Sequence, residues 1–172
     1  MKFNRNKGIL FWITGLSGSG KTSIGKLISN RIKKKYGPTI VLSGDDIRNI
    51  YEFKKYSWKE RLLLGKKNGK LLKFITDQKI NIIYSVVGLI DKLRAWNRKN
   101  IDNYVEIYIK SNINKNRKIK KKKFTMHKMG PIVGLNIKPE FPKNPNIIIN
   151  NDYKKNLQQL ANELINKSKK IK

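Results

Sequence analysis

The sequence predicts an α/β fold, a three-layer sandwich in which a mainly parallel five-stranded sheet carries helices on both faces. Five short apolar runs alternate with longer segments of helical character, the pattern of strands that are each followed by a covering helix. The runs are residues 9–14, 39–43, 80–87, 104–110 and 146–149. A glycine-rich segment, residues 15–22, follows the first run directly. Such a segment between a strand and a helix is typical of parallel α/β sheets.

Four segments between and after these runs carry apolar residues at helical spacing. They are residues 21–36, 58–77, 91–99 and 153–169. Gly37-Pro38 ends the first helix, and Ser57 with Glu60 three residues later predicts a capping box for the second. The stretch 112–145 is less regular, and we expect it to contain a basic lid, residues 112–135, followed by its return to the sheet.

Length and composition predict one globular domain over residues 1–172, since 38% of the residues are hydrophobic. No apolar stretch approaches the roughly 18 residues that a membrane helix needs, and the N-terminus leads into a strand rather than a signal-peptide core. We therefore expect a cytoplasmic protein without a membrane partner. The absence of cysteine excludes disulfides and thiolate metal sites, in agreement with a reducing compartment.

The formal net charge of +29 suggests a second class of function, a basic nucleic-acid-binding protein. We rank this class second because the lysines are spread over the whole chain among abundant Ile and Asn, as a coding bias would produce. The denser patch at residues 115–123, which includes Arg117, is instead a candidate for binding phosphates. A solvated basic helix is the alternative interpretation of that patch.

Residues 15–22 read Gly-Leu-Ser-Gly-Ser-Gly-Lys-Thr, a complete phosphate-binding loop. Glycines let the backbone curl so that N–H groups point at the β-phosphate, and the next helix offers the positive end of its dipole. Lys21 is then predicted to reach the β and γ oxygens, and Thr22 to ligate Mg²⁺. The chain is thus predicted to bind a nucleoside triphosphate. Its expected contacts are Gly15, Ser17, Gly18, Ser19, Gly20, Lys21, Thr22 and Ser23.

The segment 43–48, Ser-Gly-Asp-Asp-Ile-Arg, follows the second predicted strand at the sheet edge where ligands bind. Asp45 is a candidate to accept a proton from an acceptor hydroxyl or to hold Mg²⁺ through water. Arg48 is a candidate to clamp an acceptor phosphate with two hydrogen bonds. The alternative interpretation is a helix N-terminus whose acids complement the helix dipole.

Residues 8–22 closely resemble the opening of adenylylsulfate kinases, P-loop kinases that phosphorylate the ribose 3′-hydroxyl of adenosine 5′-phosphosulfate with ATP. The resemblance continues along nearly the whole chain. Gly44, Asp45 and Arg48 match the family's Asp-Gly-Asp-Asn-x-Arg, and Ser57 and Arg61 match its Ser-x-x-x-Arg. The return from the family's lid is matched by Gly134, Pro142, Asn144 and Pro145.

This resemblance implies a kinase that uses ATP and Mg²⁺ on a small-molecule nucleotide acceptor; a homodimer is left open. Asp45 would be the general base and Lys21 the second catalytic residue. Arg48 and Arg61 would bind the acceptor phosphate. In the lid, the resemblance implies that Arg117 stacks on the ATP base and that Lys120 steadies the transferring phosphoryl group.

Four departures from the family all lie on the acceptor side. Ser43 replaces an acid, Leu64 replaces an asparagine, residues 88–91 replace Ser-Pro-Tyr-Arg, and Ile132 replaces a phenylalanine that packs on adenine. The phosphate loop is intact, so we expect a changed acceptor. An ordinary adenylylsulfate kinase is the alternative, because Tyr56 falls where the family has another base-stacking aromatic and stacking tolerates different bases.

One relative of the family phosphorylates the 3′-hydroxyl of cytidine 5′-diphosphoramidate during capsular phosphoramidate synthesis. This acceptor keeps the ribose and the 5′-phosphoryl anhydride but carries a smaller base. A base that is stacked less extensively agrees with Ile132. The resemblance therefore makes cytidine 5′-diphosphoramidate the expected acceptor.

Overall fold

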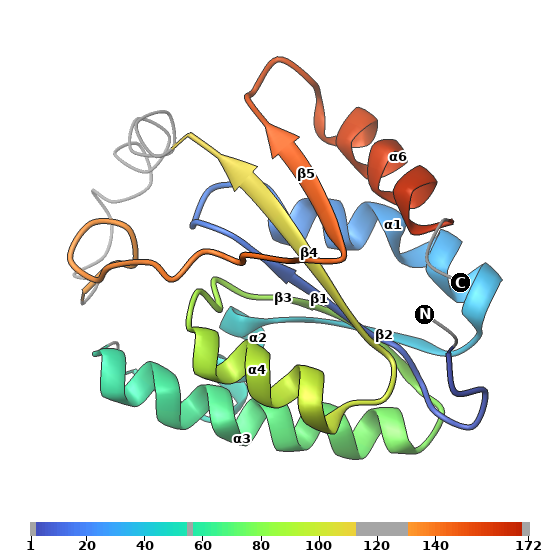
Figure 1. The fold of residues 1–172 in the computed structure, drawn as a ribbon, viewed down its shortest axis with the longest axis horizontal. Helices are drawn as coiled ribbons and strands as arrows, with labels where there is room; N and C mark the ends of the chain where they lie inside the picture. Colours follow the sequence, from blue (N-terminus) through green and yellow to red (C-terminus); the bar gives the residue numbers. More distant parts are fainter. Residues whose placement is uncertain (1–2, 55–56, 113–130, 170–172) are drawn as a thin grey trace.

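Five parallel strands form one sheet in the order β2-β3-β1-β4-β5, which confirms the predicted architecture (Figure 1). The computed structural model describes residues 3–54, 57–112 and 131–169. Its strands are β1 (Leu10–Thr14), β2 (Thr39–Ser43), β3 (Asn81–Ser85), β4 (Tyr104–Ser111) and β5 (Ile147–Asn151). The predicted strands agree with these bounds to within one or two residues at each end.

The central strand β1 lies between β3 and β4, at the point where the strand order reverses. From β1 the chain runs to β2 on one side of the sheet, and from β3 it crosses to β4 on the other. Ser85 of β3 is in register with Ile13 of β1 and with Ser43 of β2. The loops that follow these strands therefore all begin at the carboxyl edge of the sheet, where open α/β sheets bind ligands.

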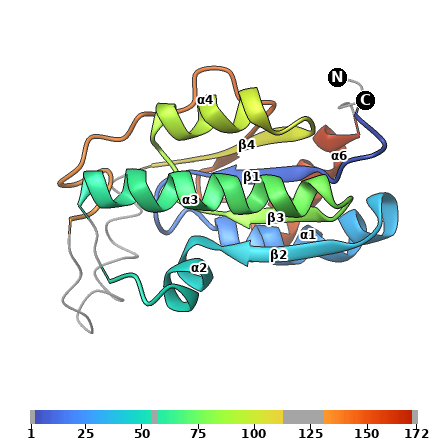
Figure 2. The same cartoon turned by 90° about the horizontal axis from the view of Figure 1, so that it is seen from below.

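Helices α1 (Lys21–Tyr36) and α6 (Leu157–Ser168) cover one face of the sheet (Figure 1). The other face carries α2 (Gly44–Ile50), α3 (Trp58–Asp77) and α4 (Asp91–Asn100), as the view from below shows (Figure 2). The α1 bounds match the predicted ones, and Gly37 ends that helix with a positive φ of 91°. Residues 44–50 form helix α2, so Asp45 and Asp46 lie in the first turn of a helix.

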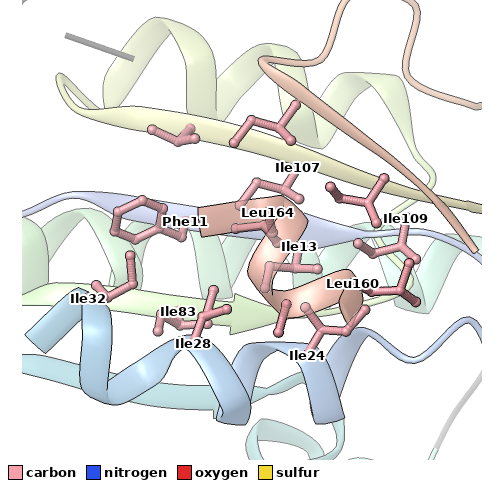
Figure 3. Close-up of a cluster of buried hydrophobic side chains, with 14 of the residues drawn as sticks. Phe11, Ile13, Ile24, Ile28, Ile32, Ile83, Ile107, Ile109, Leu160 and Leu164 are labelled. Carbon is pink, nitrogen blue, oxygen red and sulfur yellow. The ribbon is translucent and has the colours of Figure 1, made fainter. Parts of the chain in front are cut away.

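Side chains of β1 alternate between two hydrophobic cores, because successive strand residues point to opposite faces. Phe11 and Ile13 pack with α1 and α6 in the larger cluster (Figure 3). Leu10 and Trp12 pack on the opposite face with residues of α2 and α3. Both faces of β1 are thus buried, so the strand holds the start of the following loop in a fixed position.

The prediction that the last helix begins at residue 153 is wrong. Helix α6 begins at Leu157, because the Asn156 side chain accepts a hydrogen bond from the Gln159 amide and caps the helix there. Residues 152–156 instead form a loop that continues from β5 toward the end of β1. This loop contributes to the site described below.

Most of the predicted lid lies outside the described residues, as do Arg117, Lys120 and Tyr56. The described residues of the lid and its return, 131–145, contact the loops that follow β1 and β3 and the strand β4. Val133 contacts the buried cluster of Leu16 and Leu89, and the Phe141 ring lies 5.9 Å from that of Tyr108. Among the described residues, no helix is both long and apolar enough to cross a membrane.

Candidate active site

A cleft of about 930 Å³ opens at the carboxyl ends of β1, β2 and β3. We call one wall of the cleft the phosphate-loop side. It consists of residues from the loop and the start of α1 and of residues at and after the end of β5: Ser17, Gly18, Gly20, Lys21, Thr22, Ser23, Asn151, Tyr153, Lys155, Asn156 and Leu157. We call the opposite wall the α2–α3 side. Its residues come from α2, from α3, from the end of β3 with the loop after it, and from the return segment: Gly44, Asp45, Arg48, Arg61, Leu64, Gly65, Asn68, residues 84–90, Pro131, Ile132 and Val133.

The phosphate loop curls between β1 and α1 with a backbone that glycine alone adopts without strain. Gly18 and Gly20 have φ angles of 83° and 90°. A Cβ on Gly15 would lie 2.5 Å from the carbonyl oxygen of Ile109, so the loop also approaches β4 closely. Gly15 and Ser19 are buried beneath the loop, whereas Thr22 and Ser23 at the start of α1 are exposed and line the cleft.

The Lys21 side chain folds back over the loop and is only 7% exposed. Its ammonium donates a hydrogen bond to the carbonyl oxygen of Leu16 at 2.7 Å, and its Nζ lies 3.4 Å from the Ser19 hydroxyl. These contacts hold a positive charge against the loop backbone. Lys21 and Thr22 both line the cleft wall.

Two residues at the carboxyl end of β5, one in the strand and one just beyond it, support the phosphate loop from outside. The buried Asn151 amide donates to the carbonyl oxygen of Ser19 at 3.0 Å, and the Tyr153 hydroxyl donates to that of Gly18 at 3.1 Å. Tyr153 has a φ of 67°, and its amide donates to Asn151 Oδ1. Sequence analysis missed both residues. Their position at the carboxyl end of the last predicted strand was the available signal, since ligand sites gather at the carboxyl ends of parallel strands.

Asn151→Ala is expected to raise the KM for ATP about tenfold and to leave the KM for the acceptor nearly unchanged. The change leaves the Ser19 carbonyl buried without its partner, which costs about 1–3 kcal/mol and loosens the loop. Steady-state kinetics with each substrate varied in turn measure this. Asn150→Ala, at an exposed neighbouring position, is the matched control. An unchanged KM for ATP in Asn151→Ala would contradict the supporting role.

On the opposite wall, Asp45 and Asp46 have different tasks. The Ser43 hydroxyl accepts from the Asp46 amide at 3.2 Å, and Asp46 Oδ2 accepts from the Ser43 amide at 2.7 Å, forming a capping box for α2. Asp46 is thereby engaged at the helix end, and Asp45 is the carboxylate that lines the cleft. Ser43, which replaces an acid of the family motif, is buried and serves as this cap.

Arg48, Arg61 and Ile132 line this same wall. The Arg48 guanidinium lies 5.6 Å from the centre of the Phe53 ring and donates to the Phe53 carbonyl oxygen at 3.4 Å. Arg61 donates to the carbonyl oxygen of Pro131 at 2.8 Å. Arg61 thus joins α3 to the return segment beside Ile132, and the two guanidinium groups give this wall a positive charge.

The loop after β3 is fixed by Arg94, a buried residue of α4 that sequence analysis also missed. Its guanidinium donates to the carbonyl oxygens of Gly88 at 2.9 Å and Glu140 at 2.8 Å and forms an ion pair with Asp91. A further carboxylate, Glu106, lies 3.5 Å from Arg94 Nε. Burial raises the pKa of Glu106, and the charges of Arg98 and Arg94 oppose that shift. Arg94 therefore ties the cleft wall at Gly88 to the return segment.

The profile of the adenylylsulphate kinase family matches residues 7–150, so the chain belongs to this family of P-loop kinases. It is accordingly an ATP-dependent phosphotransferase that acts on small-molecule nucleotides. Among its relatives, the cytidine diphosphoramidate kinase of Campylobacter jejuni is 32% identical over 167 residues, which cover 95% of this chain and 98% of the relative. The adenylyl-sulfate kinase of Thermodesulfovibrio yellowstonii is 27% identical over 160 residues, covering 88% and 79% of the two chains.

Solved structures show the same fold. The APS kinase of Mycobacterium tuberculosis, determined in complex with AMPPNP and APS, matches this structure with a TM-score of 0.80. The match covers 95% of this chain and 98% of that one at 20% sequence identity. The fold of this chain is therefore that of a solved APS kinase structure.

Proposed function

We propose that this protein transfers the γ-phosphoryl group of ATP to the ribose 3′-hydroxyl of cytidine 5′-diphosphoramidate, within capsular phosphoramidate synthesis. The observation that carries the proposal is the 32% identity to a cytidine diphosphoramidate kinase across 98% of that protein. The cleft supports it from the structural side. Its phosphate-loop side retains the family motif, and its α2–α3 side departs from the motif at Leu64, Ile132 and residues 88–91.

The phosphate-loop side would bind ATP. In the proposal, the loop residues predicted from the sequence cradle the β- and γ-phosphates, and Lys21 exchanges its bond with the Leu16 carbonyl for the phosphate oxygens. Thr22 and, through water, Asp45 would hold Mg²⁺. No group of three His, Cys, Asp or Glu side chains gathers among the described residues, which agrees with an ion bound mainly by phosphates and water. When bound, Mg²⁺ neutralises charge on the phosphates.

The α2–α3 side would bind the acceptor. Asp45 accepts the proton of the 3′-hydroxyl, the new bond forms between that oxygen and the γ-phosphorus, and the bond to the β–γ bridging oxygen breaks to release ADP. Arg48 and Arg61 hold the 5′-phosphoryl groups by charge-assisted hydrogen bonds. The roles proposed for Tyr56, Arg117 and Lys120 concern positions outside the described residues.

Cytidine 5′-diphosphoramidate is expected to have at least a tenfold higher kcat/KM than adenosine 5′-phosphosulfate. Ile132 lines the cleft without an aromatic face, and loss of one base–aromatic stack costs about 1–3 kcal/mol. Leu64, which is buried at the same wall, leaves a polar group of the purine acceptor unpaired at a cost of about 1–3 kcal/mol. Because about 1.4 kcal/mol corresponds to tenfold, the difference is measurable.

A steady-state assay with ATP and a panel of nucleoside 5′-diphosphoramidates and 5′-phosphosulfates tests this proposal. The alternative function, an adenylylsulfate kinase in sulfate activation, is favoured by the family profile over residues 7–150. Equal or better turnover of adenosine 5′-phosphosulfate would establish that alternative and overturn the proposed acceptor.

A further inference from the structure

Three buried side chains form the bottom of the α2–α3 side of the cleft, and we call this set the polar floor. Trp12 comes from β1, Asn68 from α3 and Tyr84 from β3. The Asn68 amide nitrogen donates to the Tyr84 hydroxyl at 2.9 Å, and the Trp12 and Tyr84 ring centres are 5.2 Å apart. Their exposed fractions are 2%, 4% and 0% for Trp12, Asn68 and Tyr84. The floor is therefore a set of polar groups held in place by packing.

Part of the hydrogen-bonding capacity of this floor is unused. Among the described residues, Asn68 Oδ1 and Trp12 Nε1 are buried without a hydrogen-bond partner. Native proteins pair almost all such groups because leaving them unpaired costs free energy. The Tyr84 hydroxyl accepts from Asn68 and retains a proton to donate. Burial raises the pKa of Tyr84, so this donor stays protonated across the working pH range.

We infer that the polar floor reads the hydrogen-bonding edge of the acceptor base and that Asn68 selects cytosine by accepting from its exocyclic amino group. The inference rests on the proposed function. The floor offers one acceptor, Asn68 Oδ1, and two donors, Trp12 Nε1 and the Tyr84 hydroxyl. Cytosine presents the complementary set on its pairing edge, one amino donor with two acceptors. Enzymes that bind an isolated base commonly read this edge.

Other bases leave the floor incompletely paired. Uracil presents a carbonyl oxygen where cytosine has its amino group, which would place two acceptors against each other at Asn68. Adenine offers one donor and one acceptor on this edge and leaves one floor donor unpaired. A site built to hydrogen-bond a polar group rejects an analogue that lacks it far more strongly than an apolar pocket does.

The unpaired atoms of Asn68 and Trp12 each expose less than 1 Å². The base edge therefore reaches them only when side chains at the floor shift. For Asn68 this motion is small, because the terminal torsion of an asparagine is broad and its amide turns without displacing the backbone. Gly65, one turn before Asn68 on α3, also lines the cleft and adds no side chain over the floor.

The test compares wild-type protein with Asn68→Leu and Tyr84→Phe. Both cytidine and uridine 5′-diphosphoramidate are assayed as acceptors, and binding of CDP and UDP is measured by calorimetry with a non-hydrolysable ATP analogue present. The wild type is expected to favour the cytidine compounds by at least about a hundredfold. Asn68→Leu is expected to reduce the preference for cytidine over uridine compounds to about threefold or less, without changing the KM for ATP. Tyr84→Phe, which keeps the ring, is expected to reduce it about tenfold.

Asn97→Leu is the matched control. Asn97 lies on α4, is equally buried at 2% exposure and has an unpaired Nδ2 among the described residues, and it does not contribute to the cleft lining. Its substitution is expected to change thermal stability and to leave the cytidine-to-uridine ratio unchanged. An equal loss of the ratio in Asn97→Leu would assign the effect to packing and overturn the inference.

The remaining outcomes separate the inference from the function. If the wild type phosphorylates cytidine 5′-diphosphoramidate and the ratio survives in folded Asn68→Leu and Tyr84→Phe, the inference fails and the function stands. A wild-type preference for uridine 5′-diphosphoramidate would overturn both the inference and the proposed acceptor. If the wild type phosphorylates neither pyrimidine compound, the proposed function fails and the inference with it.

Discussion

Lys21→Ala is expected to lower kcat by about a hundredfold or more while the fold stays intact. The ammonium of Lys21 donates to the Leu16 carbonyl in this structure, and in the proposed function it moves to the phosphate oxygens when ATP binds, before the phosphoryl group begins to move. Removing one such preorganised contact typically costs two to three orders of magnitude, or about 2.7–4 kcal/mol. Steady-state kinetics with saturating ATP and cytidine 5′-diphosphoramidate measure the loss, and circular dichroism checks the fold.

Lys26→Ala provides the control for charge. Lys26 lies on the same helix, α1, and is exposed. Both substitutions remove one positive charge from a chain whose formal net charge is +29, and only Lys21 lines the cleft. A wild-type kcat in a folded Lys21→Ala protein would refute phosphoryl transfer at this loop.

Asp45→Asn is expected to reduce kcat by about two orders of magnitude or more and to leave ATP affinity close to that of the wild type. The amide keeps the shape of the side chain at the cleft wall but cannot accept the proton of the 3′-hydroxyl, and general-base loss typically costs this much. Isothermal titration with an ATP analogue and a kinetic assay measure the two quantities separately.

Asp46→Asn is the matched control for this experiment, because Asp46 is the neighbouring acid engaged in the α2 capping box. We expect it to change kcat little, because Asp46 Oδ2 is engaged with the Ser43 amide at the end of α2. If Asp45→Asn instead lost ATP affinity in the presence of Mg²⁺ at an unchanged turnover per bound complex, Asp45 would act only in holding Mg²⁺ and not as the general base.

Local sequence signals were sufficient to predict the fold and the centre of the cleft. The Gly37-Pro38 pair marked the end of α1, and the apolar runs marked each strand because both faces of a parallel sheet are buried. Lys21 and Asp45 could be placed together because each lies at the start of the helix that follows a parallel strand, and the carboxyl ends of these strands share one edge of the sheet. Such inferences need only the order of strands, loops and helices along the chain.

The residues that were missed make their important contacts far along the chain. Asn151 reaches the Ser19 carbonyl across 132 positions, and Arg94 reaches Glu140 across 46. Nothing local distinguishes Asn151 from its neighbour Asn150, or Asn68 from the other polar residues of α3. Their roles depend on which backbone or side-chain groups the tertiary fold leaves buried, and periodicity does not carry that information.

The bond between Asn151 and the phosphate loop has a consequence for synthesis on the ribosome. The loop is made among the first residues of the chain, and its support comes from the last strand, β5. Contacts between such distant segments form late, because the intervening chain must be ordered first. A nascent chain that has not yet exposed Asn151 and Tyr153 therefore carries a phosphate loop without these two supports. Strong nucleotide binding should then mark the finished protein and be absent from its growing precursor.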